Sequence, residues 1–348
     1  DVYKRQMFST RWLRTPTAHQ STTANAAATT NRIVTLTPRA YGVRLAAPRE
    51  SGYGLPNPTG HHGWMARTRA FQLETERLTV RPIARTDVTE FTRYRNLDEI
   101  ARYQDWPLPY TRDLAHGLID DTQALGRPTA DNWVQLAVDD ASGFVGDVAV
   151  WLNADQTFAT IGYTLAPEHQ GHGYALEAVE GVVDWLFRSK RVHRVGATID
   201  PRNMASARVL ERCGFEYVGT SRSSALVRGE WTDDARFSLL EPDWKAWRER
   251  PTGPPGVVSL VEITDDNVRA VGELEVAFSQ DDMVAPVLVS ISQAWAPPVV
   301  RGEPVRPWLR AIEADGELAG FVMFAEPAGR HVHPYLWRYL IDVRHQGR

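Results

Sequence analysis

The alternation of apolar and polar residues divides the chain into short strands and helices, and the first strand begins near residue 72. Residues 72–82 alternate between apolar and polar side chains, which predicts a strand. The next segment predicts a helix, because Thr86 or Asp87 can cap its start and Glu90 can complete a capping box. The same patterns predict a helix at 113–124, a hairpin over 132–152, a strand at 158–166, a helix at 174–189, a strand at 192–200, a helix at 204–212, and strands at 215–221 and 235–240.

This order of elements predicts an α/β (α+β) fold, in which helices lie on both faces of one mixed sheet. Gly214 follows the 204–212 helix at the position where a glycine commonly ends a helix. We therefore expect one complete domain over residues 72–250.

The Pro/Gly-rich segment 251–256 predicts a linker, and a second series of strand and helix patterns begins after it. From residue 257 the chain again predicts a strand, a capped turn and a helix, as at the start of the first domain. Asp315-Gly316 then joins two predicted strands, and this dipeptide is a strong hairpin signal. Residues 257–348 are therefore expected to form the N-terminal part of a second unit of similar build.

Composition narrows the class of protein. The 348 residues suffice for about two domains. A net charge of −4 argues against nucleic acid or an anionic membrane as the main partner. The single cysteine, Cys213, excludes a disulfide framework and a multi-cysteine metal site, and we expect a packed thiol and no metal. No apolar run is long enough to cross a membrane, so we expect a cytoplasmic protein.

The two ends depart from this picture. Residues 1–64 contain a low-complexity stretch rich in Ser, Thr and Ala, which predicts a disordered tail. Two interpretations stay open: an organellar transit peptide, or residues outside the native coding sequence with Met65 as the true start. The chain stops at "RHQGR", within a turn, and this predicts a truncated second unit.

The segment with the clearest chemistry is the predicted strand-to-helix loop at residues 170–175, "QGHGYA". Its glycines let backbone N–H groups turn toward one point, and the following helix adds its unpaired N–H groups and positive dipole end. Such a loop can hold a pyrophosphate, and the Gln170 side chain can add a donor. A plain glycine-rich turn is the alternative. The Rossmann and Walker A patterns are both absent.

Three motifs in order extend this interpretation: "LETERLTVRP", "IGYTLAPEHQGHGYALEA" and the "N-x-x-S" segment that ends in "LERCGF". Together they resemble the GNAT acetyltransferase superfamily, and within it the Rim-type enzymes that acetylate protein N-termini and small amines. The resemblance covers residues 72–243 and implies acetyl-CoA as co-substrate. The residues it implies at the cofactor are Tyr163, Thr164, Leu165, Gln170, Gly171, His172, Gly173, Tyr174, Ala175 and Asn203.

The catalytic groups are less clearly marked. The amine must lose a proton to attack a thioester, and the thiolate that leaves must gain one. Many GNAT enzymes have a tyrosine acid where this chain has Leu210, so Ser206, one helical turn earlier, is the substitute candidate. Rim-type enzymes often carry a glutamate where this chain has Thr160. The candidates for the base are Asp147, Glu168 and Asp200.

Two further polar residues, His172 and Glu177, lie in or next to the loop. His172 is expected to face solvent or the cofactor rather than to act as the base. Glu177 matches the family's "GYA-x-E" pattern, and we expect it to stabilise the first turn of the helix rather than take part in catalysis.

The second unit resembles a different GNAT branch, the diamine and spermidine N-acetyltransferases, through "LVEITDDN", "GELAGFVMF" and "WRYLIDVRHQGR". Gln346 matches the first position of the phosphate loop. The function expected for the whole is acetyl transfer from acetyl-CoA to a primary amine, either a peptide N-terminus or a small molecule. A non-catalytic acyl-CoA-binding module is the alternative, and oligomers are possible.

Overall fold

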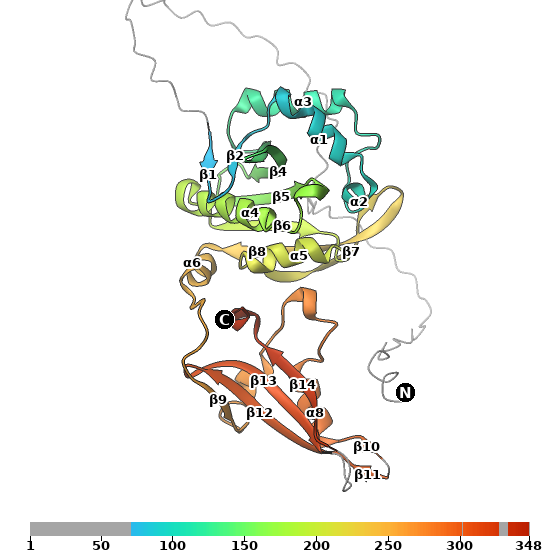
Figure 1. Cartoon of the computed structure of the whole chain (residues 1–348), viewed down its shortest axis with the longest axis vertical. Helices are drawn as coiled ribbons and strands as arrows, with labels where there is room; N and C mark the ends of the chain where they lie inside the picture. Colours follow the sequence, from blue (N-terminus) through green and yellow to red (C-terminus); the bar gives the residue numbers. More distant parts are fainter. Residues whose placement is uncertain (1–70, 301, 327–332, 348) are drawn as a thin grey trace, which may run out of the picture. The chain divides into compact units, whose positions relative to one another are not determined.

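The computed structural model describes residues 71–300, 302–326 and 333–347 (Figure 1). The expectations for the tail at residues 1–64 and for a start at Met65 lie outside these ranges. The first part of the chain, through residue 250, forms an eight-stranded sheet with the order β1-β2-β3-β4-β5-β6-β8-β7. Its strands are β1 Leu73–Glu74, β2 Thr79–Pro82, β3 Trp133–Asp140, β4 Gly143–Leu152, β5 Phe158–Leu165, β6 Arg194–Ile199, β7 Glu216–Val227 and β8 Glu230–Leu240.

Helices connect these strands in the predicted order. They are α1 Val88–Arg95, α2 Asp98–Ala101, α3 Arg112–Leu125, α4 Tyr174–Trp185, α5 Met204–Arg212 and α6 Glu241–Glu249. Short turns of 3-10 helix precede α1, as η1 (Arg85–Asp87), and the loop before α4, as η2 (Pro167–His169). The α4 helix runs on into a π-helical turn, η3 (Leu186–Lys190). The sequence pattern predicted neither the short helix α2 nor the helix α6 that follows the last strand.

Two apolar cores lie on opposite faces of the sheet, as the mixed α/β prediction requires. One contains the inward side chains of α4 and α5, and the other contains those of α1 and α3 (Figure 1). Alternate residues of β4 and β5 divide between the two faces, because successive side chains of a strand point in opposite directions. The predicted mixed sheet covered on both faces is therefore confirmed.

The strands β5 and β6 separate partway along their length. They pair in parallel only from Phe158 opposite Arg194 to Thr160 opposite Gly196. Beyond that point β5 continues to Leu165 and stays paired with β4 alone. Within the described residues, the backbone of β5 after Thr160 thus has no strand partner on its β6 side, and a gap opens in the sheet.

The start of α1 differs from the prediction. Glu90 does not complete a capping box, because its carboxylate accepts a hydrogen bond from Arg93 at 2.6 Å. Asp87 takes that role one turn earlier and accepts the backbone N–H of Ala84 at 2.8 Å. The same carboxylate pairs with Arg81 at 2.7 Å, so the cap is tied to strand β2 rather than to its own helix.

The second region, residues 257–347, contains a four-stranded antiparallel sheet with the order β14-β13-β12-β9. The predicted hairpin at Asp315-Gly316 joins β12 and β13, and both residues have positive φ, at 53° and 86°. The elements are β9 Val258–Val261, α7 Val268–Gly272, η4 Phe278–Gln280, α8 Val287–Trp295, β10 Val299–Val300, β11 Glu303–Pro304, β12 Arg306–Ala314, β13 Glu317–Glu326, β14 Tyr335–Ile341 and η5 Val343–His345.

None of the helices in the described residues is both long and apolar enough to span a bilayer. The same ranges hold no group of three or more His, Cys, Asp or Glu side chains arranged to take a metal ion. Cys213 is buried in the core beside α4 and α5, as predicted for a packed thiol.

Candidate functional site

The loop between β5 and α4 is built so that its backbone N–H groups stay free. Gly171 and Gly173 have φ of 79° and 81°, a left-handed conformation that side chains with a Cβ rarely adopt. In the described part of the chain, no hydrogen bond is donated by the backbone N–H groups of Gly171, His172 or Gly173. The first N–H groups of α4 also lack partners within the helix. The loop therefore offers a cluster of unclaimed donors at the positive end of a helix.

The loop is held from one side by the chain that precedes β2. Arg77 donates to the His172 carbonyl at 2.9 Å and binds Glu177 of α4 at 2.7 Å. The backbone N–H of Arg77 and the Thr75 hydroxyl also donate to Glu177, at 2.7 Å and 2.6 Å. Burial disfavours its charge, yet these hydrogen bonds and the Arg77 charge hold the pKa of Glu177 below its ordinary value.

Glu177 thus fastens the start of α4 to the segment before β2, and its predicted structural role agrees with this arrangement. Sequence analysis did not assign a role to Arg77. The segments "ETERL" and "GYALE" are both visible in the sequence. The sequence does not show that they lie side by side in the fold.

This anchor gives a first test. We expect Arg77→Ala to weaken acetyl-CoA binding about tenfold, because the loop loses its charged hydrogen bonds. The unfolding free energy should fall by less than about 1 kcal/mol, since the Arg77–Glu177 pair is partly exposed. Calorimetric titration with acetyl-CoA measures the first effect. Arg85→Ala is the control, because it removes another exposed ion pair, with Asp120, that lies outside the loop. Equal weakening in both variants would contradict the anchoring role.

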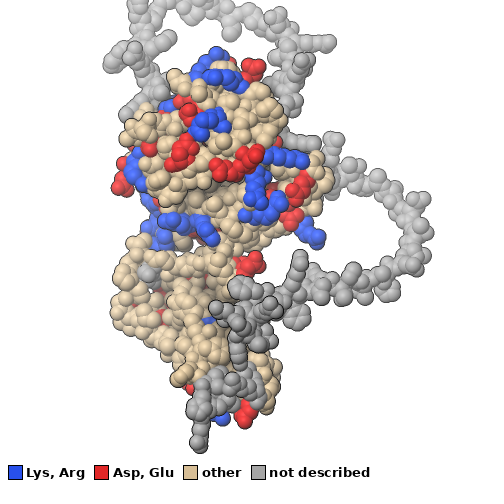
Figure 2. Space-filling view, turned by 45° about the vertical axis from the view of Figure 1, so that its right-hand side comes forward, with Lys and Arg blue, Asp and Glu red and all other residues tan. Residues whose placement is uncertain are grey.

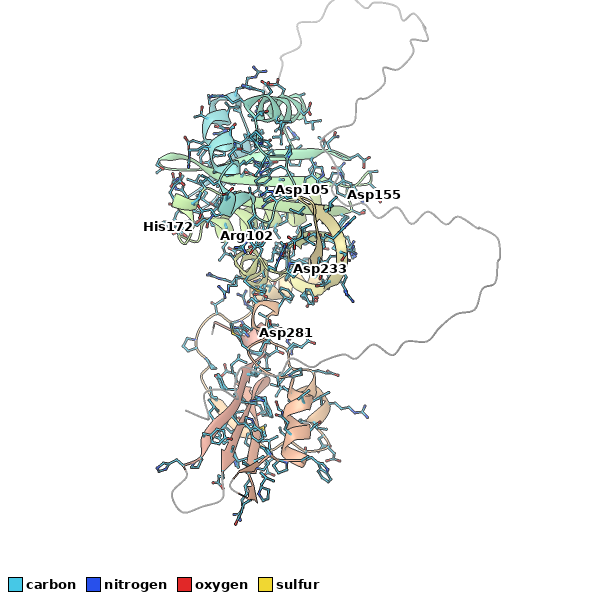
Figure 3. The ribbon with its side chains drawn as sticks, turned by 90° about the vertical axis from the view of Figure 1, so that its right-hand side faces the viewer. Arg102, Asp105, Asp155, His172, Asp233 and Asp281 are labelled. Atoms are coloured by element: carbon cyan, nitrogen blue, oxygen red, sulfur yellow. The ribbon has the colours of Figure 1, made fainter. Side chains whose placement is uncertain are left out.

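The side chains of the loop face different surroundings. The Gln170 amide donates to the carbonyl of Leu165 at 3.1 Å and so ties the loop to the end of β5. This bond occupies one of the two hydrogens of the amide group. His172 is exposed at the edge of the domain, with its ring 5.9 Å from that of Tyr174 (Figure 3). Its position agrees with the expected outward orientation.

Tyr163 and Ser206 meet beside the gap between β5 and β6. The Tyr163 hydroxyl lies 2.9 Å from the Ser206 carbonyl, to which it donates, and 2.8 Å from the Ser206 hydroxyl. In the contact between the two hydroxyls, either one can be the donor. Burial raises the pKa of Tyr163 well above its ordinary value, so it keeps its proton. Sequence analysis singled out both residues but did not foresee their contact.

Asn203 begins helix α5 as its N-cap. Its side-chain carbonyl accepts the backbone N–H of Ser206 at 3.1 Å, a usual arrangement for an asparagine cap. No hydrogen bond in the described ranges uses its side-chain NH2 group. Asn203 can therefore cap the helix and still offer a donor to a bound cofactor arm.

Asp147, a predicted candidate for the base, lies on the opposite face of the sheet and is only 2% exposed. The Tyr94 hydroxyl donates to one of its oxygens and the Gln135 amide to the other. Arg95 lies 3.5 Å away, and burial raises the pKa of the Asp147 carboxyl well above its ordinary value. Both oxygens are engaged in the interior, so this carboxyl stabilises packing between α1 and the sheet.

Arg95 is the centre of that packing. It is 5% exposed, and its guanidinium lies 4.1 Å, 4.2 Å and 5.0 Å from the ring centres of Phe91, Trp106 and Tyr110. A guanidinium stacks readily on aromatic faces, which offsets part of the cost of burying its charge. Sequence analysis did not identify this group, because its members come from α1 and from the loop after α2.

The other two candidate bases are ion-paired. Glu168, in η2, binds Arg93 and is half exposed. Its own backbone N–H and the Arg93 charge hold the pKa of its carboxyl below its ordinary value. Asp200 binds Arg202 at 2.7 Å, and although burial opposes it, that partner lowers the pKa of Asp200 as well.

One carboxyl that sequence analysis missed behaves differently. Asp105, in the loop between α2 and α3, reaches the surface next to the buried Trp106 (Figure 3). Partial burial raises the pKa of its carboxyl, and the nearby charge of Asp234 acts in the same direction. It is a solvent-accessible carboxyl whose affinity for a proton is increased.

These features define a class: a mixed α/β domain with a glycine-containing strand-to-helix loop, whose N–H groups are unclaimed, beside a gap in its sheet. Residues 77–216 match the family model described as an acetyltransferase (GNAT) domain. The chain therefore contains a GNAT acetyltransferase domain, as its motifs predicted, and the sheet has the predicted mixed, mostly antiparallel arrangement.

Similar curated proteins carry acetyltransferase names. Probable N-acetyltransferase YjcK of Bacillus subtilis (strain 168) is 42% identical over 85 residues, or 24% of this chain and 47% of that protein. Uncharacterized N-acetyltransferase p20 of Bacillus licheniformis is 29% identical over 177 residues, or 49% and 97%. The [ribosomal protein uS5]-alanine N-acetyltransferase of Escherichia coli (strain K12) is 33% identical over 88 residues, or 25% and 45%. The alignment thus spans about half the length of the first and third of these proteins.

Proposed function

We propose that residues 72–250 catalyse acetyl transfer from acetyl-CoA to a primary amine. The observation that carries this proposal is the cluster of unclaimed N–H groups at Gly171, His172 and Gly173, directly in front of α4. A pyrophosphate is the anion that such a cluster fits. The pantetheine arm would follow the edge of β5 at Tyr163 to Leu165, where β4 pairs on one side and, within the described residues, no strand pairs on the side of β6. The names of the curated relatives agree with this activity.

In the transfer, the amine nitrogen bonds to the acetyl carbonyl carbon and the carbon–sulfur bond breaks. The amine gives up a proton, and the thiolate sulfur takes one up. Backbone N–H groups along the free edge of β5 can polarise the carbonyl oxygen. The Ser206 hydroxyl, which rests on Tyr163, is our candidate for the donor to the sulfur. Tyr163 supports this role by holding the serine in one orientation.

For the amine we propose the side of the domain that carries Asp105. A carboxylate there attracts an ammonium group, and its raised pKa suits it better to accept a proton than the ion-paired Glu168 or Asp200. Asp147 is retained as a structural carboxyl, because it is buried on all sides. The acceptor class stays as proposed from the sequence: a peptide N-terminus or a small-molecule amine.

The serine role predicts a specific kinetic pattern. Ser206→Ala should lower kcat about tenfold while the KM for acetyl-CoA changes less than about twofold, because the donor acts on the leaving sulfur rather than on binding. Ser206→Thr keeps the hydroxyl and should recover most of the rate. Release of free CoA, followed with a thiol reagent, measures both constants. A rise in KM with unchanged kcat would instead make Ser206 a binding residue.

A non-catalytic acyl-CoA-binding module is the second candidate. It is favoured by the fully buried Leu210, which stands where many relatives carry a tyrosine acid. A panel of peptide and small-molecule amines, incubated with acetyl-CoA and the full chain, separates the two. Binding of acetyl-CoA without CoA release for any amine would support the module and contradict the enzyme.

A further inference from the structure

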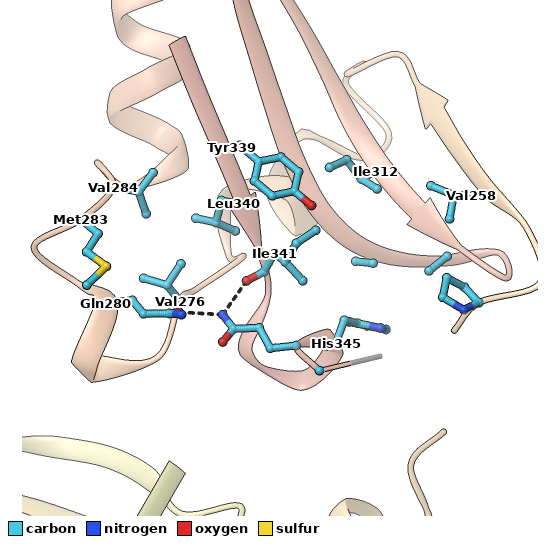
Figure 4. A pocket seen from close by; sticks show the side chains of 15 residues that line it. Val258, Val276, Gln280, Met283, Val284, Ile312, Tyr339, Leu340, Ile341 and His345 are labelled. Atoms are coloured by element: carbon cyan, nitrogen blue, oxygen red, sulfur yellow. Dashed lines mark hydrogen bonds between the residues drawn. The ribbon is translucent and has the colours of Figure 1, made fainter. Parts of the chain in front are cut away.

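The second sheet has an apolar face that the described residues leave open. A cavity of about 560 Å³ lies on it, lined by apolar side chains of β9, β12, β13 and β14 together with residues of the 276–284 segment and of the turn after β14 (Figure 4). Val258 and Leu260 on β9 are 60% and 52% exposed, and Met283 is 74% exposed. The view in Figure 2 also shows few charged side chains on the surface of this unit. Patches of this kind usually mark a surface on which another element packs.

The strands under this face repeat the first sheet residue by residue. In the first sheet Gly146 of β4 pairs with Leu165 of β5, and in the second Gly320 of β13 pairs with Ile341 of β14. At each glycine a Cβ would come within 2.4 Å of a carbonyl oxygen of the neighbouring strand. The two positions therefore have the same reason to be glycine.

A bulge falls at the same place in both sheets. The β3–β4 register shifts between Val138 and Asp139, and the β12–β13 register shifts between Ile312 and Glu313. In each sheet the residue before the shift lies opposite the glycine described above. A bulge is a local feature with a specific register, so its recurrence points to one shared design.

The correspondence continues past the last strand. Gln346 donates to the carbonyl of the final β14 residue at 2.9 Å, as Gln170 does to the final β5 residue at 3.1 Å (Figure 4). Each glutamine follows a short 3-10 turn, η5 or η2. The next residues, Gly347 and Gly171, share a left-handed φ of 80° and 79°. The second unit thus forms the opening of the same loop.

What differs is the cover over the sheet. In the first sheet, Leu78 and Val80 are 2% and 0% exposed, in one core with the apolar side of α4. By register Leu260 is the counterpart of Val80, because each lies opposite the residue before the bulge. Val258, two residues earlier, is the counterpart of Leu78. The same positions are buried under a helix in one unit and exposed in the other.

We propose that residues 257–347 are the opening half of a second acyl-CoA-binding unit, and that its open apolar face is the seat of an α4-type helix. Such a helix would place small apolar residues against β9 and β12, at the spacing of Ala178, Val179, Val182 and Val183. It would begin in the loop that Gln346 and Gly347 open and would supply the remaining N–H donors. The coenzyme A part rests on the proposed function; the helix seat does not.

The test adds such a helix to the chain and measures how strongly it shields a residue on the open face from a reagent. A copy of residues 172–190 is joined directly after Gly347 of the full chain, in a Leu260→Cys background. The chain's one cysteine, Cys213, is buried, so maleimide labelling reports on the new thiol. We expect labelling to slow about tenfold or more, because the helix covers the thiol. Val258→Cys serves as a second reporter if Leu260→Cys disturbs the fold.

A matched control carries the same extension with serine at the counterparts of Val179, Val182 and Val183, which keeps its length but removes the apolar side. Equal slowing by both extensions, or slowing by neither, overturns the helix seat. Labelling that is slow without any extension and speeds up on dilution overturns it too, because a second copy of the chain then covers the face.

The coenzyme A part has its own readout. With Gly173→Asp in the first loop, the extended chain should bind CoA in calorimetric titration at concentrations where the unextended chain, weakened about 100-fold, shows no binding. Slow labelling without this binding overturns this part alone. If the unextended Gly173→Asp chain binds CoA as tightly as the unmodified chain, the proposed function of the first loop fails, and the labelling result stands independently.

Discussion

Gly173→Asp should weaken acetyl-CoA binding by about 100-fold or more. Gly173 carries one of the unclaimed N–H groups and is the N-cap of α4, so an added carboxylate would lie beside the pyrophosphate. Two unit charges about 4 Å apart near a protein surface repel by roughly 4 kcal/mol, which is sufficient for this loss. Calorimetric titration with acetyl-CoA measures the change, and CoA release should fall in parallel.

Gly173→Asn is the matched control for this substitution. Asparagine and aspartate both tolerate the left-handed φ of 81° at this position better than other side chains, so they share the backbone cost. A Cβ would meet the Arg77 guanidinium at 3.4 Å in either case. We expect the asparagine variant to bind within about tenfold of the unmodified chain. Equal affinities of the two variants would show that no anion is held at this loop.

Asp147→Ala should lower the unfolding free energy by about 3 kcal/mol, a large part of the stability of a domain. The alanine leaves the Tyr94 hydroxyl and the Gln135 amide buried without this acceptor, and it removes the ion pair with Arg95. Denaturant unfolding followed by tryptophan fluorescence measures the change. A loss below about 1 kcal/mol would contradict the packing role assigned to this carboxyl.

Asp147→Asn separates packing from charge. The folded state raises the pKa of Asp147, so it holds a proton that the unfolded chain releases above about pH 4. The unmodified chain therefore loses stability from this group as pH rises from about 4 toward the folded-state pKa. The asparagine variant cannot ionise and should gain relative stability over that range. A difference in unfolding free energy that does not change with pH would contradict the raised pKa.

In the first domain, the local sequence pattern predicted the phosphate-type loop and the order of most helices and strands. The loop at 170–175 could be predicted from the sequence, because the left-handed φ of its glycines depends only on the residue type at those positions. Strand and helix order followed from periodicity in the same way. The capping box at Glu90 was predicted wrongly, because Asp87 is drawn to Arg81 of β2, a contact that no local rule contains.

The local sequence pattern did not predict the surroundings of the candidate catalytic residues. Asp147 and Glu168 were among the predicted candidates for the base, yet one is buried beneath α1 and the other is paired with Arg93. Asp105 was passed over because its raised pKa comes from surrounding residues distant in the chain. The contact between Tyr163 and Ser206 likewise joins two elements that only the fold brings together.

For this protein, the sequence by itself determined most of the elements, the loop and the similar build of the second unit, since each depends on residues close in the chain. Only the tertiary structure decided which groups meet: Arg77 with Glu177, and Tyr163 with Ser206. It also decided that the β9 positions matching Leu78 and Val80 are exposed. The physical reason is that burial, pKa and hydrogen-bond partners depend on neighbours in space, which a linear pattern does not contain.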